Sequence, residues 1–226
     1  MESQKLSSGS KVFDTLLEGG IEQDIITTLY GPAGVGKTCF CMLASIAAVK
    51  AGKKVIYIDT EGGFSMERFK QLCPDYNKIL EHMVFFKPST FQQQKDIFTR
   101  LNQTVNSRIG LIVVDTISML YRLEAGLTKD IVNLNKDLGQ QVNALGDISR
   151  KRNVPIIITN QVYADFLNKD KTSIVGGDIL KYASKCMIEL QAFAKGNRKA
   201  AIKKHRSIAE AKEALFKIVD IGFEAV

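Results

Sequence analysis

A run of eight residues combines three glycines with a lysine and a threonine: Gly31-Pro32-Ala33-Gly34-Val35-Gly36-Lys37-Thr38. This run has the pattern G-x-x-x-x-G-K-[ST], whose glycines let successive backbone N–H groups turn inward around phosphate oxygens. The Lys37 ammonium would then reach the β- and γ-phosphates of a nucleotide, and the Thr38 hydroxyl would bind Mg²⁺. The run therefore predicts a site for ATP and Mg²⁺.

The segments on either side of this run have the character that such a site requires. Residues 25–30 are rich in β-branched and aromatic side chains and predict a strand, whereas the apolar residues 39–49 predict a helix. The helix would direct the positive end of its dipole at the bound phosphates. This strand, loop and helix context confirms the motif at the level of sequence.

Polar side chains follow three other apolar runs that predict buried strands. Asp115 ends the run 110–115, Glu61 lies just after the run 54–59, and Gln161 ends the run 156–161. At the ligand edge of a parallel sheet, Asp115 would hold Mg²⁺ directly or through water, and Glu61 would act as the general base on the attacking water. Gln161 would sense the γ-phosphate. The alternative for Glu61 and Gln161 is an ordinary loop position.

The elements around these residues alternate between strand and helix. Helices are predicted near residues 11–18, 65–73, 90–105 and 129–152, and a further strand at 83–86. Almost wholly apolar strands predict an α/β fold with a mostly parallel sheet flanked by helices. The strand-like segments after residue 185 predict an antiparallel extension. We expect a flexible start over residues 1–10 and a single core domain over 11–226.

Composition restricts the class of protein. Hydrophobic residues make up 45% of the 226 residues, and the polar N-terminus lacks an apolar signal core, so we expect a soluble cytoplasmic protein with no membrane partner. The four cysteines lack paired spacing, which argues against a zinc site or a disulfide framework. The net charge is +7, with ten basic and five acidic residues from Lys181 onward. This excess predicts either a polyanionic partner or a solvated basic face.

Three segments together resemble RecA-like recombinases of archaea and eukaryotes. They are Tyr57-Ile58-Asp59-Thr60-Glu61-Gly62-Gly63-Phe64-Ser65-Met66-Glu67-Arg68, the run 111–115, and Thr159-Asn160-Gln161-Val162. The resemblance covers about residues 9–226. It implies a RecA-like P-loop NTPase core that binds ATP, Mg²⁺ and DNA. It also implies an accessory role in homologous recombination and DNA repair, in which Glu61 is the catalytic carboxylate and Gln161 couples the γ-phosphate to the loop after it.

The same resemblance implies two loops that contact single-stranded or branched DNA. They contain basic and aromatic residues suited to phosphates and exposed bases: Tyr121, Arg122 and Lys129 after Asp115, and Tyr163, Phe166, Lys169 and Lys171 after Gln161. It further implies that Lys204 and Arg206 complete the site of a neighbouring subunit in trans, the alternative being a general basic face. The implied partners are the main recombinase or a junction-processing nuclease, and a second copy in a dimer or short assembly.

One departure from the family bears on activity. Its strand-exchange members carry a helix-hairpin-helix domain and a linker with an F-x-x-A polymerisation motif before this core, whereas about ten residues precede it here. We therefore expect weak ATP hydrolysis and neither autonomous strand exchange nor long filaments. Two alternatives are an active strand-exchange recombinase and a RecA-fold signalling or scaffold ATPase that does not bind DNA.

Overall fold

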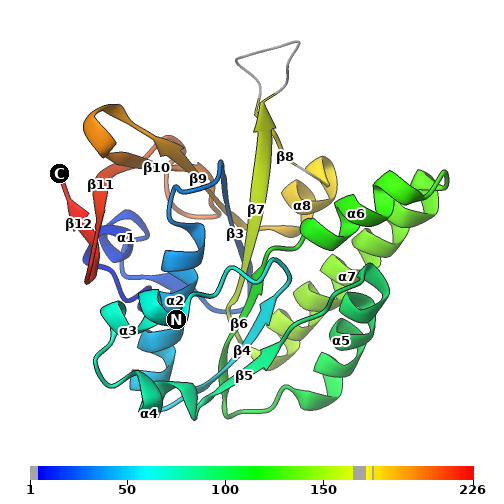
Figure 1. Cartoon of the computed structure of the whole chain (residues 1–226), viewed down its shortest axis with the longest axis horizontal. Helices are drawn as coiled ribbons and strands as arrows, with labels where there is room; N and C mark the ends of the chain where they lie inside the picture. The colour runs from blue at the N-terminus through cyan, green and yellow to red at the C-terminus, as the bar shows by residue number, and fades with distance from the viewer. Residues whose placement is uncertain (1–4, 165–171, 175) are drawn as a thin grey trace.

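The computed structural model describes residues 5–164, 172–174 and 176–226. A long sheet has the strand order β12-β11-β10-β9-β3-β7-β6-β4-β5, with β8 paired to β7 (Figure 1). A separate two-stranded sheet joins β1 to β2. The strands are β1 (Lys5–Leu6), β2 (Ile21–Glu22), β3 (Ile26–Gly31), β4 (Lys54–Asp59), β5 (Met83–Phe86), β6 (Ile109–Asp115), β7 (Ile156–Ala164), β8 (Thr172–Ile174), β9 (Cys186–Ala192), β10 (Arg198–Lys204), β11 (Glu213–Val219) and β12 (Gly222–Ala225).

Helices cover both faces of the long sheet. They are α1 (Lys11–Leu16), α2 (Lys37–Lys50), α3 (Met66–Leu72), α4 (Tyr76–Leu80), α5 (Phe91–Thr104), α6 (Met119–Leu127), α7 (Ile131–Arg152), α8 (Gly177–Ala183) and a short 3₁₀ turn at Ala194–Gly196. Figure 1 shows α1 to α4 on one side of the sheet and α5 to α8 on the other. No helix within the described part of the chain has the length and apolar content needed to span a bilayer.

Each face of the sheet has its own apolar core, because neighbouring strand residues point to opposite faces. Tyr57 packs with α2, whereas its neighbours Ile56 and Ile58 pack with α5 and α7. The central strands are buried on both sides, and this explains their almost unbroken apolar sequences. The predicted α/β class with a mostly parallel sheet is confirmed.

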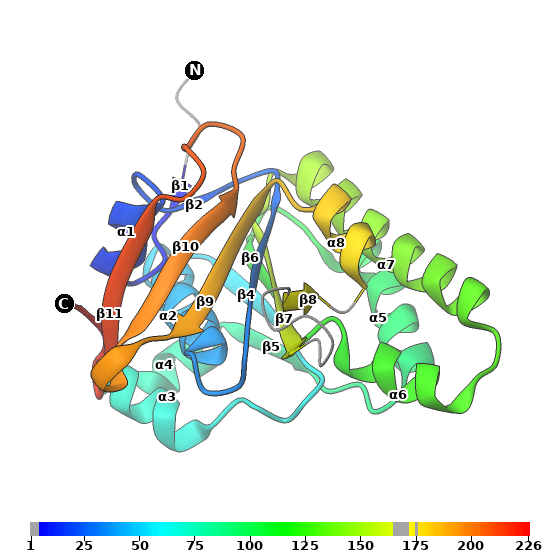
Figure 2. The ribbon, with the colours of Figure 1, turned by 90° about the horizontal axis from the view of Figure 1, so that it is seen from above.

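The antiparallel extension is also confirmed, with one refinement. Strand β9 runs parallel to β3 and antiparallel to β10, so β9 still belongs to the parallel part of the sheet. Strands β10, β11 and β12 then pair antiparallel in that order, and Figure 2 shows β9, β10 and β11 side by side. Their position brings the hairpin β11–β12 beside α1, far from it in sequence.

The start of the chain is more tightly packed than the predicted flexible segment 1–10. Lys5 and Leu6 form β1, and the Ser8 side chain is fully buried. The Asp14 carboxylate accepts hydrogen bonds from the Ser7 hydroxyl at 2.6 Å and from the Ser8 N–H at 2.7 Å. These contacts fix residues 5–10 against α1. Residues 1–4 lie outside the described residues.

The order of the parallel strands assembles the candidate site. Because β3, β7, β6 and β4 are neighbours, their carboxyl ends lie in a row at one edge of the sheet. In the register of the sheet, Gly31 is opposite Gln161, and Asp59 is opposite Asp115. Four segments that are far apart in sequence therefore meet at this edge.

Candidate nucleotide-binding site

The predicted phosphate loop connects β3 to α2. Gly34 and Gly36 have φ angles of 75° and 103°, which side chains with a Cβ rarely adopt. A Cβ on Gly36 would lie 3.0 Å from Phe223 and 3.2 Å from Ile218. Gly36 is the N-cap of α2, and it has no side chain that could cap this end of the helix. The N–H groups of the first turn of α2 are thus suited to an anion.

Lys37 lies inside this loop, with 7% of its surface exposed. Its ammonium donates hydrogen bonds to the carbonyl oxygens of Gly31 at 2.8 Å and Pro32 at 2.7 Å. Burial lowers the pKa of Lys37, and the carboxylates of Asp115 and Glu61 oppose this shift. A buried cation that is held by two carbonyl groups would gain a stronger partner in a phosphate.

Asp115 is buried at the end of β6 and held by two hydroxyl groups. Tyr57 donates to its Oδ2 at 2.9 Å and Thr159 donates to its Oδ1 at 2.5 Å. The pKa of Tyr57 lies well above its usual value because of burial and the neighbouring Asp115, so its phenol stays protonated and remains a donor. These two hydrogen bonds fix the orientation of the Asp115 carboxylate, and Thr38 lines the same cavity.

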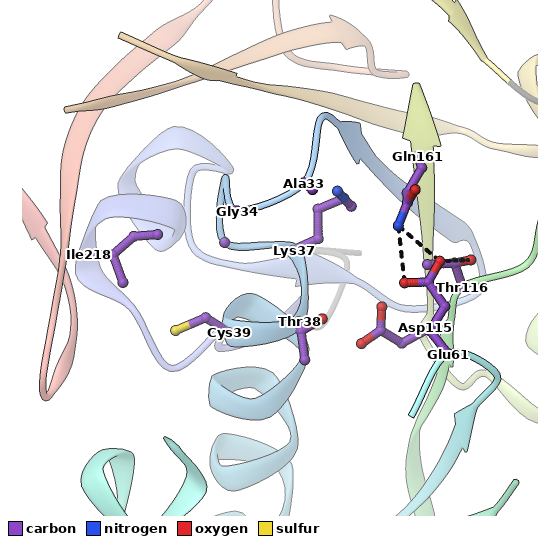
Figure 3. Close-up of a pocket in the computed structure, with 11 residues that line it drawn as sticks. Ala33, Gly34, Lys37, Thr38, Cys39, Glu61, Asp115, Thr116, Gln161 and Ile218 are labelled. Carbon is purple, nitrogen blue, oxygen red and sulfur yellow. Dashed lines mark hydrogen bonds between the residues drawn. The ribbon is translucent and has the colours of Figure 1, made fainter. Parts of the chain in front are cut away.

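Glu61 lies in the turn that follows β4. The Asp59 carboxylate shapes this turn by accepting from the N–H groups of Gly63 at 3.0 Å and Phe64 at 3.3 Å. The Gln161 side-chain amide donates to both Glu61 oxygens, at 3.0 and 3.1 Å (Figure 3). Two residues that sequence analysis treated separately are thus a hydrogen-bonded pair.

These side chains surround a cavity of about 320 Å³. Figure 3 shows Glu61, Asp115, Thr116 and Gln161 at one end, and Cys39 and Ile218 at the other. The cavity is lined by Ala33, Gly34, Gly36, Lys37, Thr38, Cys39, Glu61, Asp115, Thr116, Gln161 and Ile218. One end can thus receive the terminal phosphate, and the less polar end can receive the nucleoside.

The donor set suits Mg²⁺ better than a metal held by protein alone. Within the described residues, no group of three or more His, Cys, Asp or Glu side chains could hold a metal ion. Mg²⁺ usually takes one or two protein oxygens and completes its shell with water and substrate phosphates. The Thr38 hydroxyl and the Asp115 carboxylate match this chemistry. All four cysteines are buried and unpaired, as expected for structural thiols.

The predicted loop after Asp115 is largely helical, which corrects that expectation. Tyr121 and Arg122 lie on α6, and the Tyr121 hydroxyl donates to Asn135 at 2.6 Å while its ring packs edge-on against Phe91. Tyr121 therefore packs between α6 and the neighbouring helices α5 and α7. Lys129 is exposed in the connection between α6 and α7.

The predicted loop after Gln161 is also more regular than expected where the structure describes it. Tyr163 lies on β7, and its backbone pairs with Ser173 of β8 in an antiparallel hairpin. Phe166, Lys169 and Lys171 lie outside the described residues. The contacts of this segment with DNA stay a prediction.

Lys204 is the last residue of β10 and Arg206 follows it, at the end of the strand away from the phosphate loop. Arg198, at the start of β10, donates to the Gly34 carbonyl at 3.3 Å, and the strand extends from there for about 20 Å. The Lys204 ammonium donates to the Lys181 carbonyl, and Arg206 forms ion pairs within the chain. Their action in trans stays a prediction.

Several contacts near the cavity could not be found by motif. Ile218 and Arg198 come from the C-terminal strands, and no local pattern links them to the phosphate loop. Arg68 of α3 donates to the Val219 carbonyl at 2.6 Å and so ties α3 to the β11–β12 turn. Thr116 also lines the cavity, and the one sequence feature that could have indicated this is its position directly after Asp115.

Comparisons with known proteins agree with this geometry. The chain matches the Rad51 family over residues 2–226. It is 42% identical to the DNA repair and recombination protein RadB of Methanocaldococcus jannaschii, over 93% of this chain and 98% of that protein. It is 37% identical to the protein of the same name from Methanobrevibacter smithii, over 98% and 96%. A crystal structure of the RadB recombinase superposes with a TM-score of 0.83 at 35% identity, covering 98% of this chain and 99% of that one.

Proposed function

The chain belongs to the Rad51 family, and from this we propose that it is an ATP-binding and DNA-binding accessory protein in homologous recombination and DNA repair. It hydrolyses ATP weakly with Mg²⁺ and does not exchange strands on its own. The observation that carries the proposal is the meeting of the phosphate loop, Asp115, Glu61 and Gln161 around one cavity. The names of the similar proteins support the place of this activity in recombination and repair.

In this proposal the phosphate loop binds the triphosphate. The backbone N–H groups around Gly34 and Gly36 and the first turn of α2 surround the phosphates, while Lys37 exchanges its two carbonyl partners for phosphate oxygens. Thr38 and Asp115 would hold Mg²⁺, which when bound neutralises charge on the β- and γ-phosphates. Each Asp115 oxygen accepts one hydroxyl bond and keeps a further lone pair, so Asp115 would hold Mg²⁺ directly or through water.

Glu61 is the proposed general base. Its carboxylate lies at the polar end of the cavity and would accept a proton from the attacking water. Among the described residues that line the cavity, Lys37 is the one cation, so one ammonium faces the negative charge of the transition state. This supports the expectation of slow turnover, since stabilisation of that charge supplies most of the catalysis in phosphoryl transfer.

Gln161 is the proposed link between nucleotide and DNA. It terminates the segment of β7 that pairs with β3, and the hairpin β7–β8 continues from it. A γ-phosphate would compete with Glu61 for the Gln161 amide and so change the base of this hairpin. Tyr163, Lys169, Lys171, Arg122 and Lys129 remain the proposed DNA contacts. The proposed partners also include the main recombinase or a junction-processing nuclease, and a second copy of the chain.

A titration of single-stranded DNA, with and without ATP and Mg²⁺, tests this function. We expect nucleotide-dependent binding whose affinity falls steeply as salt rises, because protein contacts to phosphates release counterions. Absence of binding even at low salt would instead favour a scaffold ATPase. A strand-exchange assay with purified protein separates the accessory from a recombinase, and robust product formation would contradict the accessory role.

A further inference from the structure

Thr116 follows Asp115 and is bound tightly to the turn that carries Glu61. Its backbone N–H donates to the Thr60 hydroxyl at 3.0 Å, and this hydroxyl donates to the Thr116 carbonyl at 2.7 Å. The Thr60 N–H also donates to the Asp115 carbonyl at 3.0 Å. With 1% of its surface exposed, Thr116 has little freedom to move relative to this turn.

The Thr116 hydroxyl donates to Oε1 of Glu61 at 3.2 Å. The second donor to this carboxylate, the Gln161 amide, contacts both Oε1 and Oε2. The two donors differ in how firmly they are placed. Thr116 is buried and bonded through its backbone, whereas Gln161 is half-buried at the base of a hairpin.

We infer that Thr116 is a positioning residue for ATP hydrolysis, which holds Oε1 of Glu61 while Oε2 becomes the base. This inference rests on the proposed function. When the Gln161 amide turns to the γ-phosphate, the Glu61 carboxylate keeps its hydrogen bond from Thr116, which contacts Oε1, and among the described residues no donor then remains on Oε2. The exposed Glu61 side chain would otherwise lose its orientation at the moment of reaction.

The reaction then balances as an ordinary hydrolysis. A water molecule gives its proton to Oε2 of Glu61 as its oxygen bonds to the γ-phosphorus. The bond from the γ-phosphorus to the β–γ bridging oxygen breaks, and its electron pair stays on that oxygen in ADP. ADP and phosphate leave, and Glu61 releases its proton to solvent. Thr116 touches none of the reacting atoms, and its effect passes through Glu61.

The first test is Thr116→Val, which keeps the shape of the side chain and removes the hydroxyl. We expect kcat for ATP to fall about tenfold, because a hydrogen bond to a charged group is lost, while KM changes by less than about twofold. Thr116→Ser restores the hydroxyl and should recover most of kcat. The control is Thr28→Val, which removes a buried hydroxyl bond of 2.7 Å to Ser184 without touching Glu61 and should leave kcat unchanged.

A second measurement does not depend on turnover. Thr116→Val should weaken binding of ADP with aluminium fluoride, a mimic of the transition state, by about tenfold while binding of ATP stays within about twofold. Thermal unfolding checks that each variant is folded, and Thr116→Ala replaces the valine variant if valine prevents folding. In a Glu61→Gln background, Thr116→Val should have no additional effect on either measurement.

The outcomes separate the inference from the function on which it rests. A folded Thr116→Val protein with wild-type kcat and wild-type affinity for the aluminium fluoride complex overturns the inference alone. Equal loss of ATP affinity and kcat would show a general structural role and overturns it as well. A wild-type protein that binds ATP but neither hydrolyses it nor binds the aluminium fluoride complex overturns the proposed hydrolysis and the inference together.

Discussion

Arg206 connects the end of β10 to the start of the chain, and its removal should destabilise the protein. Its guanidinium donates to Glu22 at 2.7 Å and to Asp24 at 2.9 Å. The Glu22 side chain is 5% exposed, whereas the Arg206 side chain is 41% exposed. The variant Arg206→Ala would leave the Glu22 carboxylate buried with its arginine partner gone.

The size of the effect follows from this asymmetry. Removing one partner of a fully buried ion pair costs about 3–5 kcal/mol, and the exposure of Arg206 places this pair below that range, at about 2 kcal/mol. The half-exposed contact with Asp24 adds about 0.5 kcal/mol. For a chain of this size, the total of about 2.5 kcal/mol corresponds to a decrease in Tm of about 5–10 °C.

Urea and thermal unfolding of Arg206→Ala measure this loss directly. Arg150→Ala is the matched control, because it removes an ion pair of 2.6 Å to Asp147 that is exposed on both sides and should cost less than about 1 kcal/mol. Glu22→Gln in the Arg206→Ala background should recover part of the lost stability, because it removes the buried negative charge that no longer has its arginine partner. A loss for Arg206→Ala no larger than that of the control would refute the reasoning.

Three further predictions concern the cavity and the turn beside Arg206. Lys37→Ala should raise the Kd for ATP by about 150-fold, because it removes charged hydrogen bonds to the phosphates that contribute about 3 kcal/mol. Equilibrium titration with a fluorescent ATP analogue measures the Kd, and an unchanged value would show that Lys37 does not bind the nucleotide. Glu61→Gln should keep ATP affinity and lower turnover by about 100-fold, the low end of what a general base contributes. Turnover equal to that of the wild-type protein would exclude Glu61 as the base. Burial lowers the pKa of His205, whose Nδ1 accepts two backbone N–H groups at 3.1 Å. Stability should therefore be complete above the unfolded pKa of about 6.5 and fall as pH decreases below it, because the unfolded state binds the proton first. His205→Asn keeps an acceptor and should flatten this dependence in urea unfolding at pH 7.5 and 5.5; an identical dependence would contradict it.

Much of the sheet could be predicted because its central strands are apolar and end in polar residues. The bounds predicted for β4 and β5 match the structure to the residue. The helix α6 was missed, since Leu123 and Leu127 are exposed and its apolar face is short. The parallel pairing of β9 was missed because strand direction depends on the connection through α8, which has no strong sequence pattern.

The candidate site shows the same division between local and distant information. The phosphate loop, Asp115 and Glu61 each carry a recognisable local pattern. The bond between Glu61 and Gln161 depends on β7 lying between β3 and β6, an order that periodicity does not reveal. The partners of Arg206 lie more than 180 residues away, so its basic sequence neighbourhood gave no sign that its partly exposed guanidinium pairs with the buried Glu22 carboxylate.

A crystal structure with a non-hydrolysable ATP analogue and Mg²⁺ tests the central claim most directly. We predict phosphates over the N–H groups from Gly34 to Thr38, the Lys37 ammonium moved from its two carbonyl partners to phosphate oxygens, and the Gln161 amide turned from Glu61. A cavity without nucleotide, in which Lys37 still donates to Gly31 and Pro32, would contradict the account.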